Sequence, residues 1–280
     1  MDAFSAVKLS RDAYRTLAAL VYQHSGIRVG PEKQQMLANR LRRRLRELGL
    51  ASFDEYCAEL RSRSGEDEIE HLVDLISTNH THFFREPDQF DFLKANILPE
   101  LVPQLATAGS PLRVWSAAAS SGEEAYTMAI VLEEYFRIHP AVDWQLEASD
   151  ISKRMLARAQ AGIYRLDSRS PLPPELLRRY FQKGVGARAG TCRVKAELRQ
   201  RAHFQRINLF QAEYPVPRNQ HLIFCRNVMI YFDPPSRATV VHKLTHHLAP
   251  GGFLVIGNTE NLIGARSDLQ PVRHSIYRRV

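Results

Sequence analysis

The sequence lacks the features that would build a secreted, membrane-spanning or disulfide-stapled protein. Cys57, Cys192 and Cys225 lie far apart in a chain of 280 residues and form no CxxC pair, which argues against a disulfide framework or a zinc site and fits a reducing compartment. No apolar run reaches the roughly 18 residues that a membrane helix needs, and the first residues do not resemble a signal peptide. We therefore expect a cytoplasmic protein without membrane insertion.

Signatures for phosphate and metal binding are also missing. The chain contains neither GxGxxG nor GxxxxGK[ST], so dinucleotide and P-loop phosphate binding are poorly supported. His242 and His246 lie four residues apart on an expected helix, but no glutamate between them completes HExxH, and His80 and His82 have no third ligand nearby. We expect no metal site.

Positive charge is concentrated in one stretch, "NRLRRRLRELG", within a chain of net charge +8. Its arginines are Arg40, Arg42, Arg43, Arg44 and Arg46. Leucines at positions 37, 41, 45 and 48 recur at helical spacing, so one face of this helix is apolar and the rest is basic. Such a face can simply be solvated, but an arginine run without an intervening acid suits an anionic partner. Nucleic acid, an acidic protein and a membrane surface remain open at this point.

The pattern changes along the chain from helices alone to alternating strands and helices. Residues 1–75 contain four periodic segments separated by glycines, which predicts a small helical domain. These segments are 10–25, 31–48, 53–63 and 66–77. From about residue 110, strand-like runs alternate with helical ones, which predicts an α/β domain over 76–280 with a mostly parallel sheet. The strand-like runs are 112–117, 144–150, 221–227 and 251–257.

One region interrupts this alternation. Residues 180–209 contain three glycines at short spacing, followed by the strand-like runs 192–195 and 202–207. Such a composition is typical of a small antiparallel excursion. We expect a small antiparallel β subdomain at about 183–204, inserted into the larger domain.

The stretch "RVWSAAASSGEEAY" gives the best indication of a ligand. Residues 117–122 are all small, lie between a strand and a helix, and would let a ligand approach the backbone closely. Asp150 ends the next strand, where an acid commonly binds ribose hydroxyls, but it lies 28 residues after Gly122 rather than the roughly 20 of a dinucleotide site. A nucleoside without phosphate fits better; S-adenosylmethionine has that composition, and its sulfonium would favour Glu123. The alternative is a plain structural turn.

A second stretch, "FCRNVMIYFDPPS", contains Asp233-Pro234-Pro235. This tripeptide is similar to the acid-Pro-Pro-aromatic box of nucleic-acid amino methyltransferases, but Ser236 replaces the aromatic ring that would stack on a base. We favour a structural interpretation, with Asp233 as a helix N-cap and the prolines in the first turn, where no backbone donor is needed.

Six stretches in the same order resemble the CheR family of chemotaxis receptor methyltransferases. They are "ISTNHTHFFRE", "RVWSAAASSGEEAY", "ASDIS", "INLF", "FCRNVMIYFD" and "GNTEN". The resemblance covers almost the whole chain and implies an N-terminal helical domain, a Rossmann-like S-adenosylmethionine domain and a small antiparallel β subdomain. It implies methyl transfer from S-adenosylmethionine to glutamate side chains on the cytoplasmic helices of chemoreceptors, giving a glutamyl methyl ester and S-adenosylhomocysteine. We expect a monomer.

The resemblance also implies a set of cofactor-binding residues. They are Asn79, Thr81, Arg85, Glu123, Asp150, Met155, Asn208, Leu209, Arg226 and Asn227. A glutamate acceptor, with a pKa of about 4.3, is already ionised at neutral pH, so catalysis should consist mainly of positioning. Arg85 and Tyr231 are our catalytic candidates, for orienting that carboxylate. The family often has GHSEN where this chain has GNTEN, so we assign no catalytic role to Asn258 or Thr259.

The implied partner is the receptor's cytoplasmic domain. Its acidic helices would be attracted by the arginine-rich helix, and in some family members the small subdomain also holds a peptide from the receptor C-terminus. Two other functions compete. One is a nucleic-acid methyltransferase, against which Ser236 counts, so we expect no nucleic-acid partner. The other is a non-catalytic sensor of S-adenosylmethionine, against which the presence of Arg85, Asp150, Asn227 and Tyr231 counts.

Overall fold

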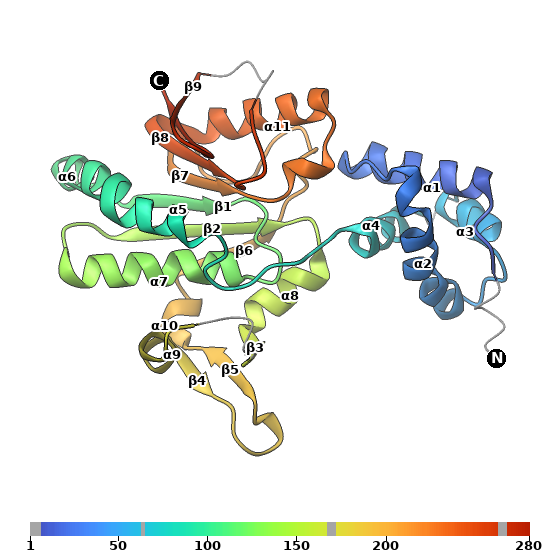
Figure 1. Cartoon of the computed structure of the whole chain (residues 1–280), viewed down its shortest axis with the longest axis horizontal. Helices are drawn as coiled ribbons and strands as arrows, with labels where there is room; N and C mark the ends of the chain where they lie inside the picture. The colour runs from blue at the N-terminus through green and yellow to red at the C-terminus, as the bar shows by residue number, and fades with distance from the viewer. Residues whose placement is uncertain (1–6, 63–64, 167–171, 263–267) are drawn as a thin grey trace. The chain divides into compact units, whose positions relative to one another are not determined.

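The computed structural model describes residues 7–62, 65–166, 172–262 and 268–280 (Figure 1). Contacts divide the chain into two compact units. The first contains residues 1–78 and 231–236, and the second contains residues 79–230 and 237–280. The short segment 231–236 thus packs with a unit from which it is far removed in sequence.

The first unit is helical, as its periodicity predicts. Its elements are α1 (Arg11–Ser25), the 3₁₀ helix η2 (Pro31–Lys33), α2 (Gln34–Leu48), α3 (Phe53–Leu60) and α4 (Gly65–Ile76). Ser10 and Ser52 cap α1 and α3, because their hydroxyls accept hydrogen bonds from backbone N–H groups three residues on, at 3.0 and 3.1 Å. Gly26 and Gly49 end α1 and α2 in the left-handed conformation. The predicted helices are confirmed, although α3 ends three residues before position 63.

The apolar stripe of α2 forms part of the core of this unit. Leu37, Leu41 and Leu45 are completely buried, whereas Leu48, the last residue of the helix, is 37% exposed. The three buried leucines pack with buried residues of α1, α3 and α4. Burying such a side chain is worth about 1.5–3 kcal/mol, so this stripe accounts for the position of α2 against the other helices.

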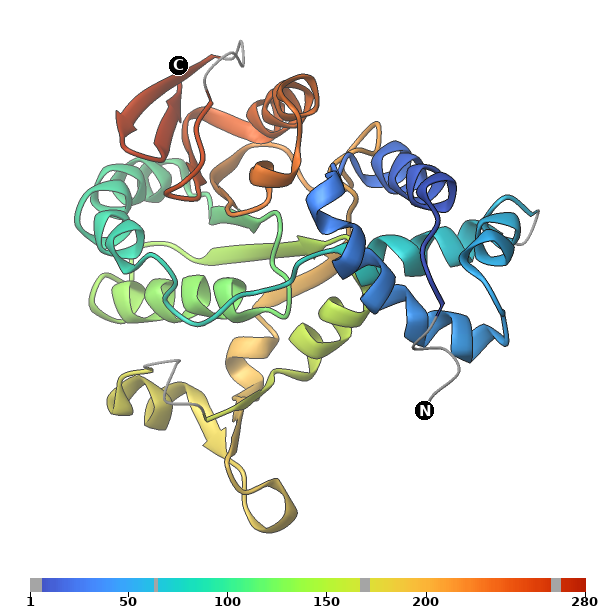
Figure 2. The same ribbon diagram turned by 45° about the vertical axis from the view of Figure 1, so that its right-hand side comes forward.

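The second unit contains the predicted parallel sheet, which is confirmed and has seven strands in the order β6-β2-β1-β7-β8-β10-β9 (Figures 1 and 2). The strands are β1 (Leu112–Ser116), β2 (Trp144–Asp150), β6 (Ala202–Arg206), β7 (Gln220–Cys225), β8 (Leu248–Ile256), β9 (Leu269–Arg273) and β10 (Ile276–Arg279). The first five pair in parallel, and β10 is antiparallel to both β8 and β9. The carboxyl ends of the five parallel strands therefore share one edge.

Helices of the second unit pack beside this sheet and bury its apolar faces. They are α5 (Pro87–Phe92), the π-helical η3 (Leu93–Ile97), α6 (Leu98–Ala108), α7 (Glu123–Ile138), α8 (Lys153–Ala161) and α11 (Pro234–His247), whose first three residues belong to the first unit. The 3₁₀ helix η5 (Met229–Tyr231) likewise ends in the first unit, at Tyr231. Both α7 and α8 contact β2 and β6. Asp233 caps α11 by accepting a hydrogen bond from the backbone N–H of Ser236 at 3.0 Å, as the structural interpretation of this tripeptide predicts.

A separate three-stranded antiparallel sheet has the order β3-β5-β4. Its elements are β3 (Ile163–Arg165), α9 (Pro174–Tyr180), β4 (Phe181–Lys183), the 3₁₀ helix η4 (Gly186–Arg188), β5 (Thr191–Val194) and α10 (Ala196–Arg199). The antiparallel subdomain is confirmed, but the prediction that residues 202–207 belong to it is wrong. Residues 202–206 form β6, which pairs in parallel with β2 in the main sheet. Alternation predicts a strand but not its partner, so the expected range of 183–204 starts too late and ends too late.

Candidate active site

Four neighbouring parallel strands lead into most of the predicted cofactor residues. β1 ends before the turn 117–122 and Glu123, β2 ends at Asp150, β6 precedes Asn208, and β7 precedes Asn227. Because the strand order reverses at β1, this edge is where an open parallel sheet binds its ligand. The fold thus gathers residues that are up to about 100 positions apart in sequence at one place.

The small-residue turn after β1 binds Asp150 directly. The Ser120 N–H donates to Asp150 Oδ2 at 2.8 Å, and the Ser152 N–H donates to Oδ1 at 2.9 Å. Asp150 is 8% exposed. Ser120 and Gly122 have positive φ, 48° and 96°, so the turn takes a backbone path that bulkier residues would resist. The two bonds fix the orientation of the carboxylate beside the turn.

Glu123 begins α7 at the end of this turn. Its Oε2 accepts a hydrogen bond from the Ser121 hydroxyl at 2.6 Å. Burial raises the pKa of Glu123, although the bond from Ser121 and the charges of Arg158 and His80 oppose the rise. No lysine or arginine nitrogen in the described parts of the chain forms an ion pair with it. A cation placed here would stabilise its charged form.

Residues 79–86 run along the same edge. The Ser120 hydroxyl donates to the carbonyl of Asn79 at 3.1 Å, and the Phe84 N–H donates to Thr127 Oγ1 at 3.1 Å. Arg85 is half-buried, and one of its guanidinium nitrogens donates to the carbonyl of His80 at 2.9 Å. Thr81 lies in this segment and is also half-buried.

Arg226, directly after β7, connects that segment to α7. Its side chain is 1% exposed and forms ion pairs with Glu86 at 3.2 Å and with Glu124 at 3.3 Å. It also donates to the carbonyl of Arg85. The Ser116 hydroxyl donates to the other oxygen of Glu124 at 2.7 Å. The guanidinium is therefore engaged with protein groups, and its main effect in this structure is to join three segments.

The two carboxylates around Arg226 have opposite pKa shifts. Burial tends to raise the pKa of Glu86, but hydrogen bonds from Asn227, Asn258 and Arg226 together with the charge of Arg226 hold it below its ordinary value. Burial raises the pKa of Glu124, and the charge of Arg226 only partly opposes this. Nearby donors and the charge of Arg226 therefore compensate the burial of the Glu86 carboxylate more fully than that of Glu124.

Backbone strain is concentrated at this edge. Six non-glycine residues in the described ranges have positive φ, and four of them lie here: Phe84 at 54°, Glu86 at 57°, Ser120 at 48° and Asn227 at 57°. Such conformations cost on the order of 1–3 kcal/mol each and persist only where surrounding contacts enforce them. Their clustering is typical of a functional site.

The remaining predicted cofactor residues flank Asp150 in space or in sequence. Met155 is 2% exposed in α8, and its N–H donates to the hydroxyl of Ser152 at 3.0 Å. Asn208 and Leu209 follow β6; the side-chain oxygen of Asn208 accepts from the Phe210 N–H at 2.9 Å, and Leu209 is 7% exposed.

The first unit contains the other predicted residues. Tyr231 is half-buried there; its carbonyl accepts from the Arg28 N–H at 2.9 Å, and the ammonium of Lys33 lies 5.4 Å from its ring centre. It follows the Arg226–Ile230 segment in sequence. Sequence reasoning missed Glu86 and Glu260, which bind that segment; both lie inside stretches that carry the family resemblance, and only their buried partners identify their roles.

The predicted basic face of α2 is largely tied to the protein itself. Arg40 donates to three carbonyls at the end of α4, and Arg44 forms an ion pair with the 9%-exposed side chain of Glu68 at 2.6 Å. Arg42 donates to the carbonyl of Val7 at 3.3 Å. Hydrogen bonds to Glu68 raise the pKa of Arg44. These arginines stabilise the first unit, in contrast to the side chain of Arg43, which is 80% exposed although it pairs with Glu47.

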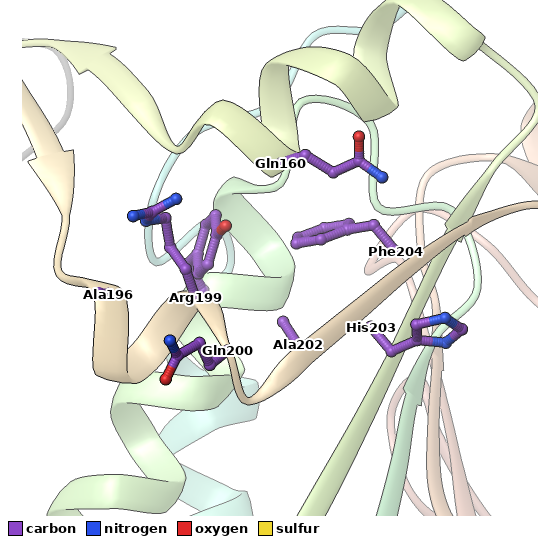
Figure 3. Close-up of a pocket in the computed structure, with 8 residues that line it drawn as sticks. Gln160, Ala196, Arg199, Gln200, Ala202, His203 and Phe204 are labelled. Atoms are coloured by element: carbon purple, nitrogen blue, oxygen red, sulfur yellow. The ribbon is translucent and has the colours of Figure 1, made fainter.

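A pocket of about 460 Å³ lies elsewhere on the second unit (Figure 3). It is lined by Tyr126, Gln160, Ala196, Arg199, Gln200, Ala202, His203 and Phe204. Phe204 and Gln160 face one another across it, and the lining residues of β6 are the first three of that strand. None of the predicted site residues lines this pocket.

The sheet order and the ligand edge together define a Rossmann-like domain of the methyltransferase class. Residues 79–278 match the family model "CheR methyltransferase, SAM binding domain", and residues 12–77 match "CheR methyltransferase, all-alpha domain". The chain therefore belongs to the CheR methyltransferase family, and its second unit is an S-adenosylmethionine-binding domain.

Curated relatives carry the name chemotaxis protein methyltransferase. That of Salmonella typhimurium is 39% identical over 90% of this chain and 85% of its own length. That of Klebsiella aerogenes is 38% identical over 96% of this chain and 90% of its own. Chemotaxis protein methyltransferase 2 of Pseudomonas aeruginosa is 37% identical over 96% and 93%. The helical unit and the methyltransferase unit are both part of this likeness.

No helix in residues 7–62, 65–166, 172–262 and 268–280 has the length and apolarity to cross a membrane. Within the same ranges, no group of three or more histidine, cysteine, aspartate or glutamate side chains could hold a metal ion.

Proposed function

We propose that this chain acts in the cytoplasm as a monomer and methylates glutamate side chains on the cytoplasmic helices of chemoreceptors. The methyl donor is S-adenosylmethionine, and the products are a glutamyl methyl ester and S-adenosylhomocysteine. The observation that carries the proposal is the small-residue turn 117–122 with Asp150 and Glu123 held beside it. The relatives' name, chemotaxis protein methyltransferase, supports a chemotaxis receptor as the acceptor.

The residues at this edge fit the cofactor chemically. Glu123 is a carboxylate whose pKa is raised by burial, and it suits a ligand that brings its own positive charge, such as an ammonium or a sulfonium. Asp150, oriented by two backbone bonds, suits ribose hydroxyls. Met155 and Leu209 add apolar surface for the adenine. When bound, S-adenosylmethionine supplies a methyl group on a positively charged sulfur.

The chain's own contribution to the reaction is to orient and partly dehydrate the acceptor. A glutamate is ionised at neutral pH, so no residue need remove a proton. Among the described residues, the Arg85 side chain donates one hydrogen bond, to the carbonyl of His80, and its planar fork suits a carboxylate. Tyr231 is our second candidate for orienting that carboxylate. Arg85 would hold the acceptor in line with the methyl group, and exclusion of water would strengthen that attraction.

Labelled methyl transfer tests the function. The full chain is incubated with tritiated S-adenosylmethionine and receptor cytoplasmic domains, and base-released methanol is counted. We expect alkali-labile label on receptor protein. Base-stable label on nucleic acid would instead indicate a nucleic-acid methyltransferase, and cofactor binding without transfer to any receptor domain would indicate a sensor.

The proposed receptor-binding surface includes fewer than the five arginines between positions 40 and 46. Arg40 and Arg44 are committed to α4 and Glu68, so their loss would destabilise the first unit. Arg43 and Arg46 are exposed and are our candidates for contact with acidic receptor helices, with Arg42 beside them.

A paired substitution tests this surface. Replacing Arg43 and Arg46 by alanine should raise the KM for receptor several-fold and weaken its salt dependence, because exposed charges steer association. Affinity for S-adenosylhomocysteine should not change. Replacing the exposed Arg11 and Arg15 of α1 by alanine removes the same charge and is the matched control. If the control raised KM equally, net charge rather than this surface would be responsible.

The small sheet is our candidate site for a receptor C-terminal peptide. A pocket of about 210 Å³ there has three cationic side chains, from Lys183, Arg188 and Arg193, and the apolar Ile163 and Val185. This composition suits a peptide that ends in a carboxylate and carries an apolar side chain. Pull-down with intact and truncated receptor tails tests it: equal capture of both would refute the assignment.

A further inference from the structure

The carboxylate of Glu260 binds the backbone of two loops at the predicted cofactor edge. Its Oε2 accepts hydrogen bonds from the N–H groups of Asn227 at 2.9 Å and Gly257 at 2.6 Å. Its Oε1 accepts from the N–H groups of Met229 at 2.7 Å and Ile230 at 3.2 Å. Glu260 is 6% exposed. Four peptide groups thus surround one buried carboxylate.

The carboxylate of Glu260 does more than cap a single segment, because it binds backbone N–H groups of two loops. A buried charge is costly unless hydrogen bonds compensate it, and here the compensation comes from backbone donors that follow the strands β7 and β8. Glu260 is the hydrogen-bond acceptor for these four N–H groups. Removing its carboxylate oxygens would therefore leave up to four backbone N–H groups without that acceptor. The bonds therefore couple the shape of the loop after β7 to one side chain.

The loop held by Glu260 contains residues on which the site depends. Asn227 has a φ of 57°, and its side-chain amide donates to Glu86 at 3.1 Å. Residues 229–231 form η5, which ends at Tyr231. A conformation that is unfavourable for a residue other than glycine needs an outside contact to persist, and the Asn227–Glu260 bond supplies one.

We propose that Glu260 is a positioning residue for the proposed methyl transfer. Its carboxylate holds Asn227 in the left-handed conformation and fixes the turn that leads to Tyr231. The inference rests on the proposed function for its catalytic consequence. The structural part, a carboxylate that organises residues 226–231, is tested without any methyl acceptor.

The main test is Glu260→Gln in the full chain. The amide keeps one acceptor oxygen, but its NH₂ group would face two N–H donors. By hydrogen-exchange mass spectrometry, peptides covering residues 226–231 should exchange faster than in the unsubstituted chain. The Kd for S-adenosylhomocysteine should rise on the order of tenfold, as expected for losing one or two buried hydrogen bonds, and kcat should fall by a larger factor. Glu260→Asp, which keeps both oxygens, should recover part of each loss.

A double-substitution cycle separates positioning from general destabilisation. In an Asn227→Ala background, Glu260→Gln should raise the Kd much less than in the unsubstituted chain, because part of the group that Glu260 positions is already gone. Leu105→Ala, a buried residue of α6, is the control. It should lower thermal stability while leaving both the exchange of residues 226–231 and the Kd unchanged.

Two results would overturn the proposal. One is native exchange at 226–231 together with native Kd in Glu260→Gln; the other is full additivity with Asn227→Ala. Failure of the proposed function looks different: the unsubstituted chain would transfer no methyl group to receptors, while Glu260→Gln would still speed exchange at 226–231.

Discussion

Replacing Arg226 by methionine should destabilise the second unit strongly. Methionine fills similar volume but leaves Glu86 and Glu124, which lie 3.2 and 3.3 Å from the guanidinium, without their shared cation. Removing one partner of a buried pair costs about 3–5 kcal/mol. In a unit of this size, each kcal/mol lowers Tm by about 2–4 °C, so we expect a fall of roughly 10 °C.

The assay can be confined to the unit concerned. The chain has two tryptophans, Trp115 in β1 and Trp144 in β2, so tryptophan fluorescence follows the second unit during urea or thermal unfolding. Arg273→Met is the matched control. Its pair with Asp88 is 3.5 Å long and both side chains are more than 40% exposed, so its loss should cost well under about 1 kcal/mol.

Two further measurements test the electrostatic origin of the loss. Adding Glu124→Gln to Arg226→Met should recover at least about 1 kcal/mol, because it removes one uncompensated charge. The pH dependence should also change. Without Arg226, the pKa values of both carboxylates should rise above their unfolded values, so the native state binds more protons than the unfolded chain and gains stability as pH falls toward those raised pKa values. A loss below about 1 kcal/mol, or an unchanged pH slope, would refute this reasoning.

Three other outcomes follow from the same edge. Gly122→Ala should lower the free energy of unfolding by at least about 1 kcal/mol and weaken cofactor binding, because Gly122 has a φ of 96° and an added Cβ would lie 2.8 Å from that of Ala159. Gly109 also has a positive φ but has open space around it. Gly109→Ala should therefore destabilise the fold without changing the cofactor affinity measured by calorimetry. Affinity for S-adenosylmethionine should fall as pH drops toward the raised pKa of Glu123, because the neutral acid no longer attracts a cation, and Glu123→Gln should flatten this dependence. ATP should not compete with labelled S-adenosylmethionine, since two glutamates begin α7; competition at equal concentration would contradict that.

Local features of the fold could be predicted because they depend on neighbours in sequence. Asp233 caps α11 as the sequence predicts, and the leucine spacing of α2 identifies its buried face. The parallel sheet follows from strands that alternate with helices. The pairing of β6 with β2 could not be predicted, because residues 202–206 alternate equally well for either sheet.

The residues expected to bind the cofactor remain a prediction, and the ion pairs that surround them could not be predicted from the sequence. Most of the cofactor residues expected from the family resemblance come together after neighbouring parallel strands. The pairing of Arg226 with Glu86 spans 140 positions, and that of Arg44 with Glu68 spans 24. No sequence period relates such partners. The sequence alone therefore does not show that Arg226 and Arg44 form ion pairs with carboxylates of the protein itself.

The charge balance beside the turn 117–122 bears on which class of nucleoside ligand this edge of the sheet favours. A turn of small residues at a helix N-terminus would ordinarily favour phosphate, since its N–H groups point outward and the helix dipole attracts an anion. Here α7 begins with Glu123 and Glu124, and Glu124 shares its single buried cation with Glu86. The carboxylates at this edge outnumber its buried guanidinium and leave the edge negative, which disfavours a phosphate and favours a sulfonium. By this argument, the preference for a positively charged ligand depends on the two glutamates at the start of α7. The small residues of the turn contribute only the space that the ligand needs.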